Sequence, residues 1–425
     1  MKFTRVFAFM ALAGLAGSAF ATNGDNLIGL GVQSRALGGT GTAAFFGSEN
    51  ALTNPALLGK MQGSEFAIGG TAFMPDVKAT TNVGGFTGSA TSDADFSVIP
   101  EVSMATRIND NLTFGLGMFG TAGMGVDYRG DTMDNALLFQ GYTNLQLMKF
   151  VPSLAYNSGP FGLGGAVVIQ YGALDINYVM PDGTPTGKTV GDGTSTDLQL
   201  GFNLGGYFDI TKDLTVGLAY QSEIGMEYDG QLTTAANGFG LGSCATCTQT
   251  IVSDKLAQPA EIKAGVAYAM GPWMFTGDFK RIMWGDADGY KDFNWDDQDV
   301  FGLGVKYSGT GWWVGAGYNY GEDPIAVLPN AAAMPDAYVN QAINMFNNHF
   351  FPAVVESHFT VGGGYALGKN TMLEGALVYA DEVSKTIDTG IITSAFAGAP
   401  MAPDATSHTV EHSQLAVTVS VRMNF

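Results

Sequence analysis

Charged residues are scarce in this chain of 425 residues, and positively charged ones are the scarcest. Asp, Glu, Lys and Arg make up 14% of the sequence, where soluble domains average about a quarter. With 19 Lys and Arg against 39 Asp and Glu, the net charge is −20. A chain without a basic excess cannot displace the counterions of nucleic-acid phosphates, so nucleic acid is excluded as a partner.

Long apolar runs are also missing after the first 21 residues. No stretch of about 18 consecutive apolar residues follows, so the sequence predicts no transmembrane helix. The beginning is different, because Lys2 and Arg5 stand at the head of an apolar run over 6–20, and Ala19-Phe20-Ala21 offers small residues for a cleavage site. We therefore predict a signal peptide over 1–21, a mature chain that starts at Thr22, and export.

Candidates for catalysis or metal binding are few. The Gly-x-Ser-x-Gly motif of hydrolases does not occur, and we predict no enzyme, no cofactor and no metal site. Cys244 and Cys247 share one predicted loop, and in an exported chain we expect them to form a disulfide, since a metal site would need two more soft ligands. The four histidines fall in or beside predicted outer loops: His349, His358, His408 and His412.

Glycine is abundant, at 60 residues, and so is a period-two alternation of apolar with small or polar residues. From Leu415 to Phe425 every odd position is apolar. Segments of about ten residues with this pattern suit strands that cross a bilayer at a tilt. We predict fourteen strands, near 64–74, 95–108, 111–128, 143–157, 161–180, 197–210, 213–229, 258–270, 272–284, 299–308, 311–320, 356–368, 370–382 and 413–425.

The predicted strands are joined alternately by tight turns and long loops. The turns at 109–110 and 211–212 are tight, whereas the loops at 230–257 and 321–355 are long. Outer-membrane barrels have short turns on the periplasmic side and long loops outside, and a closed barrel leaves no unpaired strand edge in lipid. The sequence therefore predicts an all-β, 14-stranded antiparallel barrel over 61–425 in a bacterial outer membrane.

Residues 22–60 do not follow the strand pattern, and they contain the motif Asn54-Pro55-Ala56. Further motifs follow at Ile99-Pro100-Glu101, Phe114-Gly115-Leu116-Gly117 and Phe161-Gly162-Leu163-Gly164, and the chain ends on the aromatic Phe425. In this order and spacing the motifs resemble the FadL/TodX family of outer-membrane transporters for long-chain fatty acids and hydrocarbons. The resemblance covers essentially all of residues 23–425.

The resemblance implies that residues 22–60 form a hatch that plugs the barrel and that a hydrophobic cargo is taken up passively. It implies a lateral exit at a kink in the third strand, which we place at Gly120, Gly123 and Gly125, although these glycines can also be read as close-packing positions. An outer-membrane position implies contact with lipid and lipopolysaccharide. Phe425 resembles the terminal signal for the barrel-assembly machinery. A general porin or a surface adhesin on the same barrel is the alternative function.

The long loop at 321–355 contains a predicted helix that starts at Pro335-Asp336. Apolar residues in an outer loop either pack over the barrel mouth or meet a ligand, and both readings stay open here. The resemblance implies a surface groove that collects cargo. Its residues are Val339, Ile343, Phe346, Phe350 and Phe351.

Strand parity places Glu261, Lys263, Asp278 and Lys280 on the lumen side of two neighbouring strands. Buried unlike charges normally pair, which favours a structural ion-pair network, while a carboxylate-binding role for Lys263 or Lys280 is the alternative. The inner stretch at 170–172 lacks the arginine that helps hold a carboxylate in fatty-acid members of the family. Fatty acids and neutral or aromatic hydrocarbons therefore both remain candidates for the cargo.

Overall fold

The computed structural model describes residues 22–130, 139–180, 187–242, 251, 253–331, 334–398 and 400–425. The predicted signal peptide at 1–21 and the cysteine pair Cys244 and Cys247 lie outside these residues. Both therefore stay predictions.

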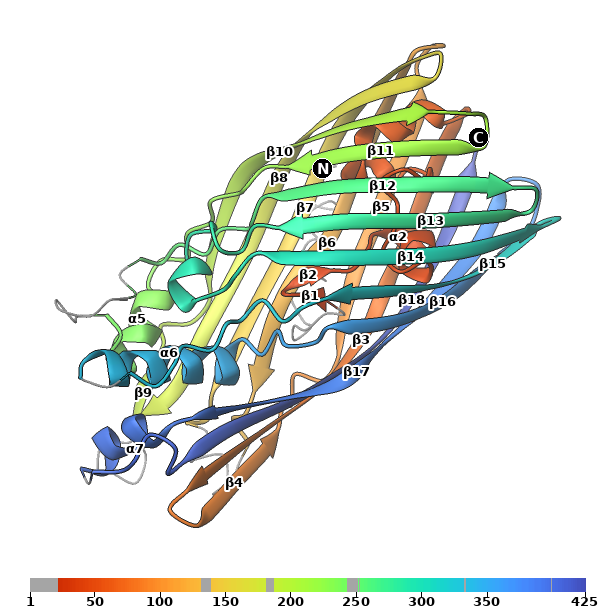
Figure 1. Cartoon of the computed structure of the whole chain (residues 1–425). Coiled ribbons are helices and arrows are strands. Elements are labelled where there is room, and N and C mark those ends of the chain that lie inside the picture. The colour runs from red at the N-terminus through yellow and green to blue at the C-terminus, as the bar shows by residue number, and fades with distance from the viewer. Residues whose placement is uncertain are drawn as a thin grey trace, which may run out of the picture.

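Fourteen antiparallel strands form a closed barrel, which is the ring of arrows in Figure 1. The last strand pairs with the first along its whole length, from Ser407 opposite Asn82 to Asn424 opposite Glu65. The predicted strand number and the closed barrel are confirmed. The strands are β3 (Ser64–Val83), β5 (Ser97–Arg107), β6 (Leu112–Asp127), β7 (Tyr142–Ser158), β8 (Phe161–Met180), β10 (Ser195–Asp209), β11 (Leu214–Gln221), β12 (Glu261–Met270), β13 (Trp273–Ile282), β14 (Gln298–Gly309), β15 (Trp312–Gly321), β16 (Ser357–Ala366), β17 (Thr371–Asp388) and β18 (Ser407–Asn424).

The alternation of residues along each strand sets the two faces of the wall. On β10, Leu198, Leu200 and Leu204 are 62%, 68% and 52% exposed, whereas Asn203 is 1% exposed. A ring of large apolar side chains on the outside and polar side chains inside is the pattern of a barrel in lipid.

Some strands differ in length from the prediction. β3 continues to Val83 and turns through two glycines into β4 (Phe86–Thr91), and β17 and β18 extend together to Asp388 and Ser407. These extensions are rich in small and polar residues, so the alternation of apolar residues did not predict them. β11 instead ends at Gln221, short of the predicted 229, and the chain beyond it makes isolated bridges only.

Residues 22–60 lie inside the ring of strands, where Figure 1 shows them in red. They form two short strands and three helical turns, almost all buried. The backbone approaches the wall closely at glycines: a Cβ on Gly164 would lie 2.3 Å from the Ala56 nitrogen. The elements are β1 (Thr22–Asn23), β2 (Asn26–Leu27), α2 (Gly31–Ala36), α3 (Asn50–Thr53) and the 3₁₀ helix η2 (Pro55–Lys60).

The long loops pack together at the end of the barrel opposite the tight turns (Figure 1). Their apolar residues form one large core with the outer part of the wall. In the described part of the chain, no helix has the length and hydropathy to span a membrane. The loop elements are β9 (Lys188–Val190), α5 (Leu232–Gly238), η3 (Lys291–Phe293), α6 (Asp336–Phe350) and α7 (Gly390–Ala397).

Candidate functional site

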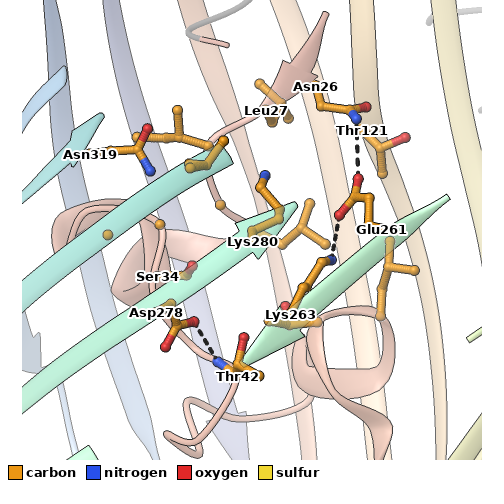
Figure 2. Close-up of a pocket in the computed structure, with 18 of the residues that line it drawn as sticks. Asn26, Leu27, Ser34, Thr42, Thr121, Glu261, Lys263, Asp278, Lys280 and Asn319 are labelled. Atoms are coloured by element: carbon orange, nitrogen blue, oxygen red, sulfur yellow. Dashed lines mark hydrogen bonds and ion pairs between the residues drawn. The ribbon is translucent and has the colours of Figure 1, made fainter. Parts of the chain in front are cut away.

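A small cavity lies in the barrel lumen between residues 26–53 and the inner faces of seven strands (Figure 2). Its volume is about 70 Å³. An engineered protein cavity that binds benzene measures about 150 Å³. The cavity is therefore too small for an aromatic hydrocarbon or an acyl chain unless the N-terminal residues move.

The four charged residues placed in the lumen by parity all line this cavity. The Lys263 ammonium lies 2.8 Å from a Glu261 carboxylate oxygen. Asp278 accepts hydrogen bonds at 2.8 Å from the backbone nitrogens of Gly41 and Thr42, so it holds the N-terminal segment to β13. Three of the four charges are thus engaged in structural contacts.

Lys280 is the exception. Among the residues that the structure describes, its ammonium makes no hydrogen bond and no ion pair, and Figure 2 shows it pointing into the cavity toward Leu27. Glu261 is already engaged by Lys263 and by the Asn26 side-chain amide, which donates at 3.1 Å. Lys280 is therefore the ammonium with free capacity for an anionic ligand.

Lys149 is a cavity residue that the sequence analysis missed. It lies on β7 directly opposite Gln170 of β8, is 2% exposed, and donates to the Gln221 side-chain oxygen at 3.2 Å. The stretch of β8 around Gln170 contains no cation, because the cation at this place comes from the neighbouring strand. Parity along β7 could have found it, since Phe150, Leu154 and Tyr156 face outward.

The hatch motif connects the N-terminal segment to the wall. The Asn54 amide donates to the carbonyls of Thr42 at 2.7 Å, Gly206 at 3.2 Å and Leu218 at 3.4 Å. Its oxygen accepts from the Ala56 nitrogen at 3.1 Å and so caps η2, with Pro55 at the first helical position. The motif therefore fixes residues 42–60 against β10 and β11.

Buried ion pairs hold the same segment on the other side of the barrel. Arg35 of α2 pairs with Glu101 of β5 at 2.5 Å. Arg422 of β18 contacts Glu49 at 2.8 Å, Glu65 at 2.6 Å and Glu374 at 3.0 Å. Removing one member of such a buried set leaves an uncompensated charge, so residues 31–60 are firmly anchored.

Residues 22–30, which we call the strap, are held by single hydrogen bonds rather than by ion pairs to the wall. The Asn23 amide donates to Asn319 at 2.9 Å. The Asp25 carboxylate accepts from the Tyr290 hydroxyl at 2.5 Å and from Gln258 at 3.2 Å, both in outer loops. Burial raises the pKa of Asp25 from 3.8 to about 6. The strap is thus the weakly held part of the N-terminal segment.

The wall has an opening between β5 and β6. Their pairing ends at Glu101 opposite Phe119, although β5 begins at Ser97 and β6 continues to Asp127. Both stretches are fully described, and no ladder hydrogen bonds join 97–100 to 120–126. Beyond this gap the Asp93 nitrogen donates to the Asp127 carbonyl at 2.8 Å. We call the bounded gap the window.

The predicted kink glycines all lie in the stretch of β6 that borders the window. The register of β6 against β7 shifts between Gly120 and Ala122, and residues 119–126 are all buried, as expected for a strand that bends toward the lumen. The Gly123 nitrogen donates to the Asp25 carbonyl of the strap at 3.1 Å. A Cβ on Gly120 would lie 2.5 Å from a methyl group of Ile99, so the Ile99 side chain fills the window.

The predicted groove residues of α6 are buried under the outer loops. Phe346 stacks on Phe293 with ring centroids 4.8 Å apart and contacts Phe239 at 5.6 Å, and Phe350 contacts Tyr178 at 5.4 Å. In this state they close the barrel mouth and offer no open groove. The exposed fractions are 3% or less for Val339, Ile343, Phe346, Phe350 and Phe351.

Comparison with known proteins gives a family match and several relatives. Residues 7–341 match the model of the family described as outer membrane protein transport protein (OMPP1/FadL/TodX). A long-chain fatty acid transport protein of Escherichia coli O6:H1 is 25% identical over 389 residues, which cover 78% of this chain and 84% of the relative.

The fold is shared with solved structures, of which two serve as examples. The toluene transporter TodX of Pseudomonas putida superposes with a TM-score of 0.64 at 16% identity, covering 93% of this chain and 99% of TodX. A FadL homologue of Pseudomonas aeruginosa gives a TM-score of 0.68 at 14% identity, covering 95% of this chain and 100% of the homologue.

Proposed function

The chain belongs to the outer membrane protein transport protein family (OMPP1/FadL/TodX), and from that premise we propose that it takes up hydrophobic small molecules passively and releases them sideways through the window. The outer loops, with Val339, Ile343, Phe346 and Phe350 of α6 and the following Phe351, collect the cargo when they part from the closed arrangement described above. The lumen cavity, enlarged by movement of the N-terminal residues, then holds it, and the gap beside Gly120 lets it pass into the membrane.

The interrupted pairing of β5 and β6 is the observation that carries this proposal. An apolar molecule that left through the periplasmic end would have to enter water, whereas an opening in the wall leads directly into hydrocarbon. Pro100 supports the interruption because it has no N–H to donate to β6. Ile99 and the strap occupy the opening, so release requires that both move.

For the cargo, we propose a long-chain fatty acid. Among the described residues Lys280 makes no hydrogen bond or ion pair, and the Lys149 ammonium donates only to a neutral amide, so two of the three lysines at the cavity can receive a carboxylate. Hydrogen bonds to charged groups are stronger than those between neutral groups, which favours an anionic head over a neutral hydrocarbon. The E. coli relative named for long-chain fatty acid transport agrees with this choice.

A disulfide across the window tests the route. A Cβ on Gly120 would lie 3.8 Å from the Ile99 Cβ, about the mean separation in disulfides. In the double variant Ile99→Cys/Gly120→Cys, we expect oxidation to abolish cellular uptake of labelled oleate and a reductant to restore it. Binding of oleate to the detergent-solubilised protein should persist in both states.

The controls are the two single-cysteine variants and the natural chain with and without reductant, all of which should transport normally. Full uptake by a double variant whose disulfide has been verified by mass spectrometry would exclude the window as the exit. Loss of both binding and uptake in the reduced variant would mean that the substitutions damage the site itself.

Two further expectations remain part of the proposal. Residues 22–60 act as the hatch, because they fill the lumen and are bonded to the wall at Asn54, Arg35 and Glu49. Phe425 is 76% exposed at the end of β18, where it is accessible to the barrel-assembly machinery.

A further inference from the structure

A second hollow lies on the lipid-facing side of the wall, away from both the lumen cavity and the window. It is a depression of about 440 Å³ across β15, β16, β17 and β18. Its outer lining is apolar and consists of Trp312, Val314, Gly363, Tyr365, Leu373, Gly375 and Val419.

The depression exists because two glycines are direct neighbours on the outer face. Gly363 of β16 is paired with Gly375 of β17, and the same row continues to Val314 of β15 and Val419 of β18. Val314 and Val419 are 50% and 51% exposed, so this row faces lipid. Two adjacent positions without side chains leave a hollow between rows of large ones.

The position of the hollow along the membrane normal matches one leaflet. Gly363 is three residues from the end of β16 at Ala366, about 10 Å along a strand. That end belongs to the tight-turn side, which is periplasmic in outer-membrane barrels. One leaflet contributes about 15 Å of hydrocarbon, so an acyl chain from the periplasmic leaflet reaches the depression.

A positive charge stands where the head group of such a lipid would lie. Lys369 is exposed in the tight turn between β16 and β17, the two strands that carry the paired glycines. Glu374 is adjacent to the hollow, but its carboxylate faces the lumen and is held by Arg422 at 3.0 Å. Trp312 and Tyr365, 39% and 65% exposed, lie at the same end, where aromatic residues favour the membrane interface.

We propose that this depression is a binding site for a periplasmic-leaflet phospholipid, with one acyl chain over Gly363 and Gly375 and the phosphate at Lys369. Lipid A occupies the opposite leaflet and cannot bring its phosphates to Lys369. The site does not depend on the transport route, because it uses neither the lumen nor the window.

Two variants and two matched controls test the site. Gly375→Leu fills the hollow, and its Cβ would meet only the Thr418 carbonyl at 3.6 Å, an ordinary contact. Gly277→Leu is the control: this glycine also faces lipid, between the exposed Val266 and Leu303, with its nearest atom at 3.5 Å. Lys369→Gln removes the head-group contact, and Lys212→Gln is its control in another tight turn.

The measurement is native mass spectrometry of protein released from nanodiscs of phosphatidylethanolamine and phosphatidylglycerol. The natural chain and both controls should retain one phospholipid. Retention should fall about tenfold in Gly375→Leu, because the leucine takes the place of the acyl chain and removes its van der Waals contacts with the hollow. It should fall about threefold in Lys369→Gln, as for loss of one exposed charge pair.

Equal retention by all five proteins, each with the heat-dependent gel mobility of a closed barrel, would overturn the proposal. Retention of lipid A in place of phospholipid, from nanodiscs that contain both, would also overturn it. So would a dimer that Gly375→Leu disrupts, since the hollow would then receive a second copy of the chain.

Discussion

Lys280 and Lys149 face one cavity, but they differ in what a ligand would have to displace. A carboxylate can approach Lys280 without breaking a hydrogen bond or ion pair among the described residues, whereas at Lys149 it must share the ammonium with Gln221. Lys263 is already paired with Glu261. The order of expected contribution to binding is therefore Lys280, then Lys149, then Lys263.

Replacing Lys280 tests the proposed cargo. For Lys280→Gln we expect the Kd for oleate to rise about ten- to a hundredfold, since a hydrogen bond to a charged group contributes about 1.5–3 kcal/mol. The Kd for toluene, which has no head group, should stay the same. Isothermal titration of the detergent-solubilised protein measures both values, and Lys212→Gln is the control. An unchanged Kd for oleate would argue for a neutral cargo.

Parity along the strands was enough to predict the lumen positions of Glu261, Lys263, Asp278 and Lys280. It could not predict their partners, because Asp278 bonds to backbone nitrogens of residues 41 and 42, which are far away in sequence. Lys149 was missed for a related reason: its importance comes from the register that sets it opposite Gln170. Cross-strand register depends on the closed ring rather than on any single strand.

Among the elements, the hairpin of β1 and β2 contacts both the outer loops and the bent part of the wall. Its turn holds Asp25, buried against Tyr290 and Gln258, and its backbone bonds to the bent part of β6. Outer loops, strap and window thus meet at one residue. A change in the charge of Asp25 should therefore change how firmly the strap lies on the window.

The raised pKa of Asp25 predicts the direction of this effect. The docked strap binds the proton more tightly than the released strap, whose Asp25 has the ordinary value of 3.8. Docking should therefore weaken as the pH rises from about 4 to about 6 and stay constant above, by about 3 kcal/mol in total. Hydrogen exchange of the strap amides, corrected for intrinsic rates, measures this change.

The variant Asp25→Asn supplies the comparison, because it keeps the shape of the side chain and cannot ionise. Its strap protection should not vary over this pH range and should exceed that of the natural chain at pH 7. A natural chain whose strap protection is flat or rises between pH 4 and 6 would contradict the assigned role of Asp25.

The sequence indicated the kink through the glycines of β6 but not the window itself. Gly120, Gly123 and Gly125 mark a strand that can bend. The gap, however, also needs β5 to stop pairing at Glu101, and nothing in the sequence of β5 apart from Pro100 signals that. The α6 helix was expected in the loop, while its burial under α5 and η3 depends on contacts between loops whose relative positions a sequence does not give.

For the whole molecule, the fourteen strands and the closed barrel were predictable because every strand in contact with lipid must follow the same residue pattern. Each must show an apolar outer face, and each edge must be paired. The strand ends were less predictable where β3, β17 and β18 extend as ribbons with small and polar side chains. There the constraint from lipid no longer applies.

Removing the N-terminal segment tests whether it seals the barrel. We expect a chain without residues 22–60 to fold, since Arg422 keeps Glu65 and Glu374, and Glu101 becomes solvated when water fills the lumen. In planar bilayers this variant should show a large, unselective conductance, while the full chain shows little. Equal conductance of the two proteins would contradict a sealing role for residues 22–60.

The contacts of Arg422 also bear on the order of assembly. This arginine is in the last strand, and its partners are Glu65 in the first strand, Glu374 in the neighbouring strand and Glu49 in the lumen segment. One arginine therefore links the pairing of β18 with β3 to the position of residues 22–60 in the lumen. Because closure of the barrel and placement of residues 22–60 satisfy the same arginine, we expect these two steps of assembly to be coupled.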